Sequence, residues 1–255
     1  MTSPILIKDT AIGEGIPKIC VPITGSTEEE ICREAEAAVA AGADLAEWRA
    51  DYFENLLQPG GLLPVLKKLG EILEQLPLIF TIRTKEEGGQ ISLSMEQYRQ
   101  CCLDAAGSGC ADLIDVQVFG REEEKKELIR QIQKEGVCVI ASSHDFEKTQ
   151  ETQMLLERFR VMDQTGADIL KIAVMPRKPA DVSAIMQATE QMQKTCRKPL
   201  ISMSMGEMGG ISRLQGEKFG SAVTFGVVGA SSAPGQFPIG ILREELLAFH
   251  EKISE

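Results

Sequence analysis

The sequence predicts a (β/α)8 barrel, a fold in which eight parallel strands alternate with helices around a closed sheet. Short apolar segments rich in β-branched residues recur along the whole 255-residue chain and start about 29 residues apart, the length of one strand–helix unit. Helical patterns fill most of the intervals between them. The alternative, an open doubly wound sheet, usually has fewer strands and a visible change in strand order.

The eight predicted strands mostly begin after a Gly, Pro or Ala/Asp turn signal. They are residues 18–23, 43–49, 78–83, 112–118, 136–142, 167–174, 199–205 and 222–228. The predicted helices lie at 26–42 and near 60–75, 94–106, 121–135, 149–165, 180–195 and 238–252. In the first helix Ser26 or Thr27 can cap the N-terminus, and Gly42 ends it. The Gly-rich segment 206–221 gives the weakest signal and predicts a loop with a short helix.

Residues 1–17 predict an additional β-hairpin ahead of the first barrel strand. Apolar residues alternate before the segment AIGEG at 11–15, which we expect to form the turn. We expect the hairpin to close the bottom of the barrel. No Pro/Ser-rich linker and no change in composition divides the chain, so residues 1–255 are predicted to form one domain.

The composition excludes several classes of function. The chain has 27 Lys and Arg against 38 Asp and Glu, a net charge of −11, which disfavours nucleic acid and anionic membranes as partners. No apolar run is long enough to span a bilayer, and the segment MTSPILIKDT has no long apolar stretch behind a basic start, so we expect no secretion signal. The seven cysteines include no CxxC pair, and the two histidines lie far apart. We therefore expect a soluble, cytoplasmic protein without a zinc site or other metal.

Charged residues fall on the interior face of the predicted barrel. Side chains alternate between the interior and the helix layer, so the second strand places Glu47, Arg49 and Asp51 inside. The same alternation places three more polar side chains inside: Arg83, Gln117 and Lys171. Active sites of such barrels are assembled from the C-terminal ends of several strands, so these residues predict a catalytic rim. The alternative is an ion-pair network that only neutralises itself.

Lys171 and His144 are the candidates for covalent and proton-transfer chemistry. Lys171 has apolar neighbours on both faces of its strand, which disfavours the charged ammonium and leaves more neutral amine as nucleophile. The alternatives are a lysine paired with Glu47 or Asp115, or one that extends to the rim. His144 follows the fifth strand, one strand away, and can move a proton next to that amine.

The loops after the seventh and eighth strands predict an anion site. Arg213 lies in the first loop, and the segment GASSAPGQ with Ser232 and Gln236 forms the second. These loops often bind an anion in barrels, and an arginine beside Gly-rich backbone suits a carboxylate or phosphate. Gly229 and Gly235 also suggest a loop that closes over its ligand.

An ordered series of motifs spans the chain: PKICVPI, EWRADYF, TIRTKEEGG, DLIDVQVF, SSHDF, LKIAVMP, the Gly-rich segment and ASSAPGQ. In this order, with a lysine on the sixth strand and a histidine after the fifth, the chain resembles the type I 3-dehydroquinate dehydratases. These are Schiff-base enzymes of the shikimate pathway. The resemblance implies a homodimer that needs no cofactor and acts on the small molecule 3-dehydroquinate. Biosynthesis and quinate breakdown use the same elimination, so the resemblance is compatible with a role in either pathway.

The resemblance also assigns roles to individual residues. It implies that Lys171 forms an imine with the C3 ketone and that His144 removes the C2 proton and protonates the departing C1 hydroxyl. This syn elimination gives 3-dehydroshikimate and water. Glu87 would orient His144, and Arg213 would hold the substrate carboxylate. The remaining matched positions, which engage hydroxyls or order the pocket, are Glu47, Arg49, Arg83, Ser232 and Gln236.

One position departs from the pattern, and two other functions stay open. Many relatives carry a second acid where this chain has Gln117; if that acid tunes the lysine or histidine, the pH profile is shifted here. The first rival function is a class I aldolase-type barrel, which also uses a lysine on the sixth strand and usually binds phosphorylated sugars. The second is a non-catalytic relative that binds the ligand without turnover.

Overall fold

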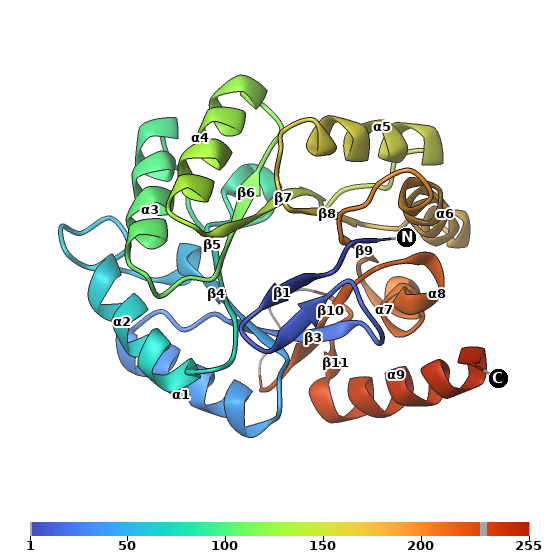
Figure 1. Ribbon diagram of the computed structural model, residues 1–255, viewed down its shortest axis with the longest axis horizontal. Coiled ribbons are helices and arrows are strands. Elements are labelled where there is room, and N and C mark those ends of the chain that lie inside the picture. The colour runs from blue at the N-terminus through green and yellow to red at the C-terminus, as the bar shows by residue number, and fades with distance from the viewer. Residues whose placement is uncertain (1, 230–233, 255) are drawn as a thin grey trace.

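Eight parallel strands curl into a barrel that helices surround on the outside (Figure 1). The computed structural model describes residues 2–229 and 234–254. The barrel strands are β3 (Lys18–Ile23), β4 (Leu45–Arg49), β5 (Leu78–Thr81), β6 (Leu113–Gln117), β7 (Cys138–Asp145), β8 (Ile169–Val174), β9 (Leu200–Ser204) and β10 (Val223–Val227). They pair in chain order, and β10 pairs with β3. A bridge from Leu200 to Ser221 brings β9 beside the start of β10, so the predicted barrel is confirmed.

The helices follow the strands as predicted. They are α1 (Glu28–Ala40), α2 (Leu62–Leu73), α3 (Met95–Gly107), α4 (Glu122–Lys134), α5 (Thr152–Asp163), α6 (Pro179–Gln193) and α9 (Ile239–Ser254). Thr27 caps α1, because its side chain accepts from the backbone N–H of Glu30. The Gly-rich segment holds the 3-10 turn η3 (Glu207–Gly209) and two short helices, α7 (Gly210–Leu214) and α8 (Gly216–Phe219). The short strand β11 (Phe237–Pro238) pairs beside β10.

Alternation along each strand separates two apolar layers. Residues such as Leu45 and Ile169 pack inside the barrel, whereas Trp48 and Leu170 pack between the sheet and the helices. All four side chains are buried. Apolar residues from several strands fill the interior of the barrel near the N-terminal ends of the strands. The polar residues that also point inward lie nearer the C-terminal ends.

The N-terminal hairpin differs from its prediction at the turn. Strands β1 (Ile5–Ile7) and β2 (Thr10–Ile12) pair so that Ile7 faces Thr10, which leaves Lys8 and Asp9 as the turn. The expected turn at 11–15 is therefore wrong. The two-residue turn, with Lys8 at φ 51°, carries the apolar alternation on to Ile12, which is then buried.

The hairpin does occupy the predicted end of the barrel. Ile12 belongs to the interior apolar layer, and Ile5 and Ile7 pack against it. Polar contacts fix the same position: the hydroxyl of Thr10 donates to the carbonyl of Asp44, just before β4. Among the described residues, no helix combines the length and apolarity that a membrane span requires.

Candidate active site

Lys171 lies in a cluster of charged side chains inside the barrel. Its Nζ is 3.1 Å from Oε1 of Glu47 and 3.3 Å from Oδ2 of Asp115, and it lies 4.5 Å from the ring centroid of Phe225. Lysine and both carboxylates are buried. Of the alternatives that the sequence left open, the structure therefore shows the ion-paired lysine, with two carboxylates instead of one.

Arg83 and Ser142 complete the surroundings of Asp115. The Arg83 Nη2 lies 3.0 Å from Oδ2 of Asp115, and Ser142 donates its hydroxyl to Oδ1. Burial alone would raise the pKa of Asp115, but the nearby cations Arg83 and Lys171 outweigh it and hold that pKa below its ordinary value. Asp115 is thus a carboxylate at neutral pH, and its negative charge holds the two cations in place.

Arg49 points into the same region from the end of β4. Its Nε and Nη2 each donate at 2.8 Å to one carboxylate oxygen of Asp51, in the 3-10 turn η1 (Ala50–Tyr52). Asp51 also accepts the backbone N–H of Arg83 at 3.1 Å. This bidentate pair fixes the guanidinium and joins the ends of β4 and β5.

His144 and Glu87 form a hydrogen-bonded pair beside the lysine. Both the ring Nδ1 and the backbone N of His144 lie within 3.0 Å of Oε2 of Glu87, in the 3-10 turn η2 (Lys85–Glu87). His144 belongs to β7 and does not follow it, which corrects the sequence-based boundary. Pairing with β8 continues to His144 and Asp145, opposite Ala173 and Val174.

The pKa values of this pair favour a neutral histidine. Burial, with the cations Arg83 and Lys171, lowers the pKa of His144 well below its ordinary value. Burial also raises the pKa of Glu87 to about 7. When Glu87 is ionised, it accepts the Nδ1–H of the neutral ring, so Nε2 carries the free lone pair of a base.

Arg213 is a buried cation for which no described residue supplies a negative partner. It is 2% exposed in α7, and Nη1 and Nη2 reach the sulfur of Met203 at 3.6 Å and the carbonyl of Pro234 at 3.4 Å. Its Nε has no partner in the described structure, and no described carboxylate forms an ion pair with it. Burial lowers the pKa of Arg213 to about 10. An uncompensated buried charge is costly, so this position is prepared for an anion.

These groups surround one cavity at the C-terminal end of the barrel. It is lined by Glu47, Arg49, Arg83, His144, Phe146, Lys171, Ala173, Met203, Met205, Arg213, Phe225 and Gln236. The cavity thus brings together Lys171, the His144 imidazole and the Arg213 guanidinium, for which no ion pair is formed among the described residues. Ser232, and the part of the loop expected to close over the ligand at 230–233, lie outside the described residues.

Comparison with known proteins identifies the family. The family model described as type I 3-dehydroquinase matches residues 19–253. The 3-dehydroquinate dehydratase of Klebsiella pneumoniae is 44% identical over 96% of this chain and 98% of its own length. The solved structure of the type I 3-dehydroquinate dehydratase from Clostridium difficile superposes with a TM-score of 0.94 at 41% identity, covering 98% of this chain and 99% of its own. The chain belongs to the type I 3-dehydroquinase family.

This finding confirms the resemblance and the expectation of an enzyme of the type I 3-dehydroquinase family. The 3-dehydroquinate dehydratase of Listeria monocytogenes, at 40% identity over 97% of this chain and 98% of its own length, gives the same result. A phospho-2-dehydro-3-deoxyheptonate aldolase from Thermotoga maritima superposes with a TM-score of 0.61 at 15% identity, covering 99% of this chain and 73% of its own. That likeness is one of fold alone and gives the aldolase alternative no further support.

Gln117, which the sequence analysis expects to depart from the resemblance, forms no hydrogen bond with Lys171 or His144 in the described part of the structure. Its side-chain oxygen accepts the backbone N–H of Thr84 at 2.8 Å, and its nitrogen donates to the Thr84 hydroxyl at 3.1 Å. Gln117 thus fixes the start of η2, which carries Glu87.

Several residues of this region were not predicted from the sequence. Ser142 and Phe225 lie on the interior parity of their strands, so the same alternation could have revealed them. Arg158 of α5 donates to the Ser143 hydroxyl. Its guanidinium also stacks over Phe119, where the Cζ atom lies 3.8 Å from the ring centroid. No local signal marks Arg158, because its partners lie on other elements. In the described part of the chain, no three His, Cys, Asp or Glu side chains gather as metal ligands would.

Proposed function

We propose that this protein dehydrates 3-dehydroquinate to 3-dehydroshikimate through an imine on Lys171, as a cytoplasmic enzyme of the shikimate pathway. The observation that carries the proposal is the placement of Lys171 and His144 on adjacent strands. Arg213, which forms no ion pair with the described residues, lines the same cavity. The relatives named 3-dehydroquinate dehydratase support this substrate. The Clostridium difficile relative was solved with covalently modified comenic acid, which supports covalent chemistry in the family.

Imine formation begins with the amine of Lys171. The ammonium must first lose a proton, and the carboxylates of Glu47 and Asp115 are acceptors in hydrogen-bond reach. The neutral amine adds to the C3 carbonyl carbon, and the resulting carbinolamine loses water to give the protonated imine. His144 can exchange protons in this step because it lines the same cavity.

Elimination then uses the protonated imine as an electron sink. His144 takes the C2 proton at Nε2, and the electron pair of the C–H bond forms the enamine. The enamine expels the C1 hydroxyl, which leaves as water with the proton carried by His144, and the imine is restored in conjugation with the new double bond. Hydrolysis consumes one water and frees Lys171. Since imine formation released one water, the net reaction releases one.

Substrate binding follows from the charges of the cavity. Arg213 would hold the carboxylate, because it is the buried guanidinium for which no ion pair is formed in the described structure. Glu47, Arg49 and Arg83 would engage hydroxyls or order the pocket from β4 and the end of β5. Gln236 lines the same cavity as Arg213, and Ser232 is proposed from its motif alone.

A direct assay tests the function. The product conjugates its ketone with a new double bond, so turnover appears as a rise in ultraviolet absorbance when 3-dehydroquinate is added. We expect turnover by the wild type and by Lys194→Met, an exposed lysine, and none by Lys171→Met with a native circular dichroism spectrum. Folded wild type that binds 3-dehydroquinate without product would identify a non-catalytic relative. Turnover by Lys171→Met would contradict the imine mechanism.

We also propose a homodimer, on the family resemblance. Light scattering of the purified chain should then give twice the mass of 27.8 kDa. A monomer mass across the working concentration range would contradict the dimer and would leave the catalytic proposal intact.

A further inference from the structure

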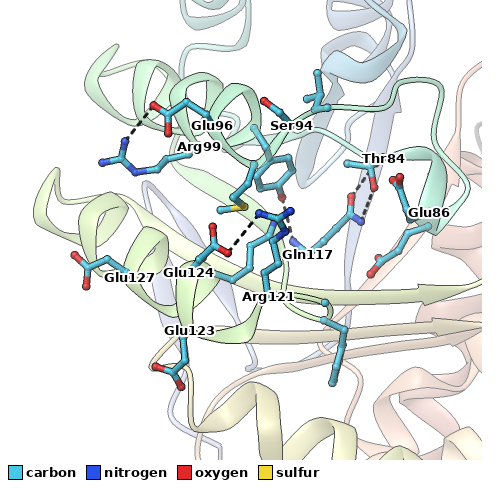
Figure 2. Close-up of a pocket in the computed structure, with 17 residues that line it drawn as sticks. Thr84, Glu86, Ser94, Glu96, Arg99, Gln117, Arg121, Glu123, Glu124 and Glu127 are labelled. Atoms are coloured by element: carbon cyan, nitrogen blue, oxygen red, sulfur yellow. Dashed lines mark hydrogen bonds and ion pairs between the residues drawn. The ribbon is translucent and has the colours of Figure 1, made fainter.

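A second cavity lies outside the barrel, between α3 and α4. It is a groove of about 1000 Å³ lined by η2, the first turns of both helices and the residues that follow β6. Figure 2 shows its lining side chains, with Gln117 turned toward Thr84 and Arg121 beside Glu124. Lys171, His144 and Arg213 do not line this groove. Glu87 lines the groove and also contacts the ring of His144, so this one side chain separates the groove from the active site.

Lys125 of α4 is the buried charge of this groove. It is 7% exposed, and its Nζ lies 3.4 Å from the ring centroid of Tyr98 in α3. No carboxylate of the described residues forms an ion pair with it. A buried ammonium that rests only on an aromatic face retains the capacity to bind an anion.

The rim of the groove has the opposite charge. Six glutamates and three basic residues line the groove, a formal balance of −3. Arg121 pairs with Glu124 at 3.5 Å and Arg99 with Glu96 at 3.7 Å, so these charges offset each other. Glu123 forms no ion pair with the described residues. The electrostatic field at the mouth of the groove therefore favours a positively charged group. In the interior, by contrast, the ammonium of Lys125 favours a negatively charged group.

Apolar side chains form the rest of the wall. Leu93 lies just before α3, Met95 is the first residue of α3, and Phe119 follows β6. They lie in the same groove as Lys125, so an occupant can bury an apolar part beside its polar groups.

We propose that the groove between α3 and α4 binds an α-amino acid with an apolar side chain. The carboxylate would pair with Lys125, the ammonium would face the glutamates of the rim, and the side chain would pack against Met95 and Phe119. A phosphate or a plain carboxylate supplies no positive group for the acidic mouth. A simple amine supplies no anion for Lys125. The zwitterion matches both, and the site is independent of the proposed dehydration.

Calorimetric titration of the full chain with L-leucine tests the proposal. We expect saturable binding of L-leucine, weakened on the order of tenfold for L-leucinamide, which lacks the carboxylate, and for 4-methylpentanoate, which lacks the ammonium. Equal binding of 4-methylpentanoate would overturn the role of the acidic rim. No saturable binding of L-leucine, L-methionine or L-phenylalanine at millimolar concentration would overturn the site.

Variants on α4 connect the binding to Lys125. Lys125→Met keeps the aliphatic stem and should weaken L-leucine on the order of tenfold, whereas Lys134→Met, an exposed lysine of the same helix, should not. Turnover of 3-dehydroquinate checks that both variants fold. Equal affinity of Lys125→Met and wild type would refute the contact with Lys125.

The pH dependence gives a second readout. Burial lowers the pKa of Lys125 to about 8. The groups that face it are Tyr98 and Cys102 of α3, Glu87 of η2, Asp115 of β6 and Glu124 of its own helix. Only the ammonium pairs with a carboxylate, so affinity for L-leucine should fall as the pH rises above about 8. An affinity that stays constant from pH 7 to about 9, where most of the free L-leucine still carries its ammonium, would contradict the assignment.

Discussion

Arg213 has a large desolvation cost at the position where we propose that the substrate carboxylate binds. Its guanidinium is buried against Met203 and the carbonyl of Pro234, and no described carboxylate compensates it. The free protein therefore carries an unfavourable charge that a bound carboxylate would neutralise. Sequence reasoning could predict an arginine in this loop. It could not predict the missing counter-ion, because that depends on which side chains the other elements around the cavity direct inward.

Replacing Arg213 by methionine separates binding from folding. Arg213→Met should weaken substrate binding by about 2 to 4 kcal/mol, seen as a large rise in KM, because it removes the anion contact. The free energy of unfolding in urea should stay equal or rise, because a buried unpaired charge is removed. Arg160→Met, an exposed arginine paired with Glu157, is the control. An unchanged KM would rule out the anion contact.

Glu87 should set the acidic limb of the pH–rate profile. Its pKa is about 7, and only its carboxylate accepts the Nδ1–H of His144. As the pH falls through about 7, Glu87 takes up a proton and the base-competent orientation of His144 is lost, so kcat should decrease. Glu87→Gln should lower kcat about 10- to 100-fold and flatten this limb.

The neighbour Glu86 provides the matched control for Glu87. Glu86 is exposed, and a hydrogen bond from Thr84 lowers its pKa. Glu86→Gln should leave kcat and the acidic limb unchanged. An acidic limb that survives in Glu87→Gln would assign the titration to another group.

At the scale of elements, local pattern predicted most strands and helices but not their ends. β7 extends to Asp145 because its pairing with β8 continues, and that partner lies about 30 residues away in the chain. The hairpin turn was misplaced for a similar reason. The glycines at 13 and 15 resemble a turn signal, whereas the burial of Ile12 under the barrel decides the register.

The hairpin should contribute stability and not chemistry. Ile12 is buried in the interior layer, so Ile12→Ala should lower the free energy of unfolding by about 2 to 4 kcal/mol. Leu6 is 70% exposed on the same hairpin, and Leu6→Ala should change stability little. Urea denaturation measures both, and kcat of Ile12→Ala should stay near that of the wild type. Equal losses in the two variants would contradict the closing role of the hairpin.

At the scale of the whole molecule, the barrel gathers charges that the net charge conceals. The chain carries −11 overall, yet Arg49, Arg83, Lys171 and Arg213 line one cavity. Strand alternation predicted which side chains point inward. The distances that make Lys171 contact both Glu47 and Asp115 depend on closure of the barrel, which brings strands distant in the sequence to one axis. The groove beside Lys125 likewise needs two packed helices and has no signature in the sequence.

The central claim is that Lys171 forms an imine with 3-dehydroquinate. Sodium borohydride reduces an imine to a stable secondary amine, so treatment during turnover should leave the substrate or product skeleton on the protein. Mass spectrometry of the intact chain and its peptides should then find one adduct, on the peptide that contains Lys171, and none in Lys171→Met. Folded, active protein without an adduct, or with the adduct on another lysine, would contradict the account.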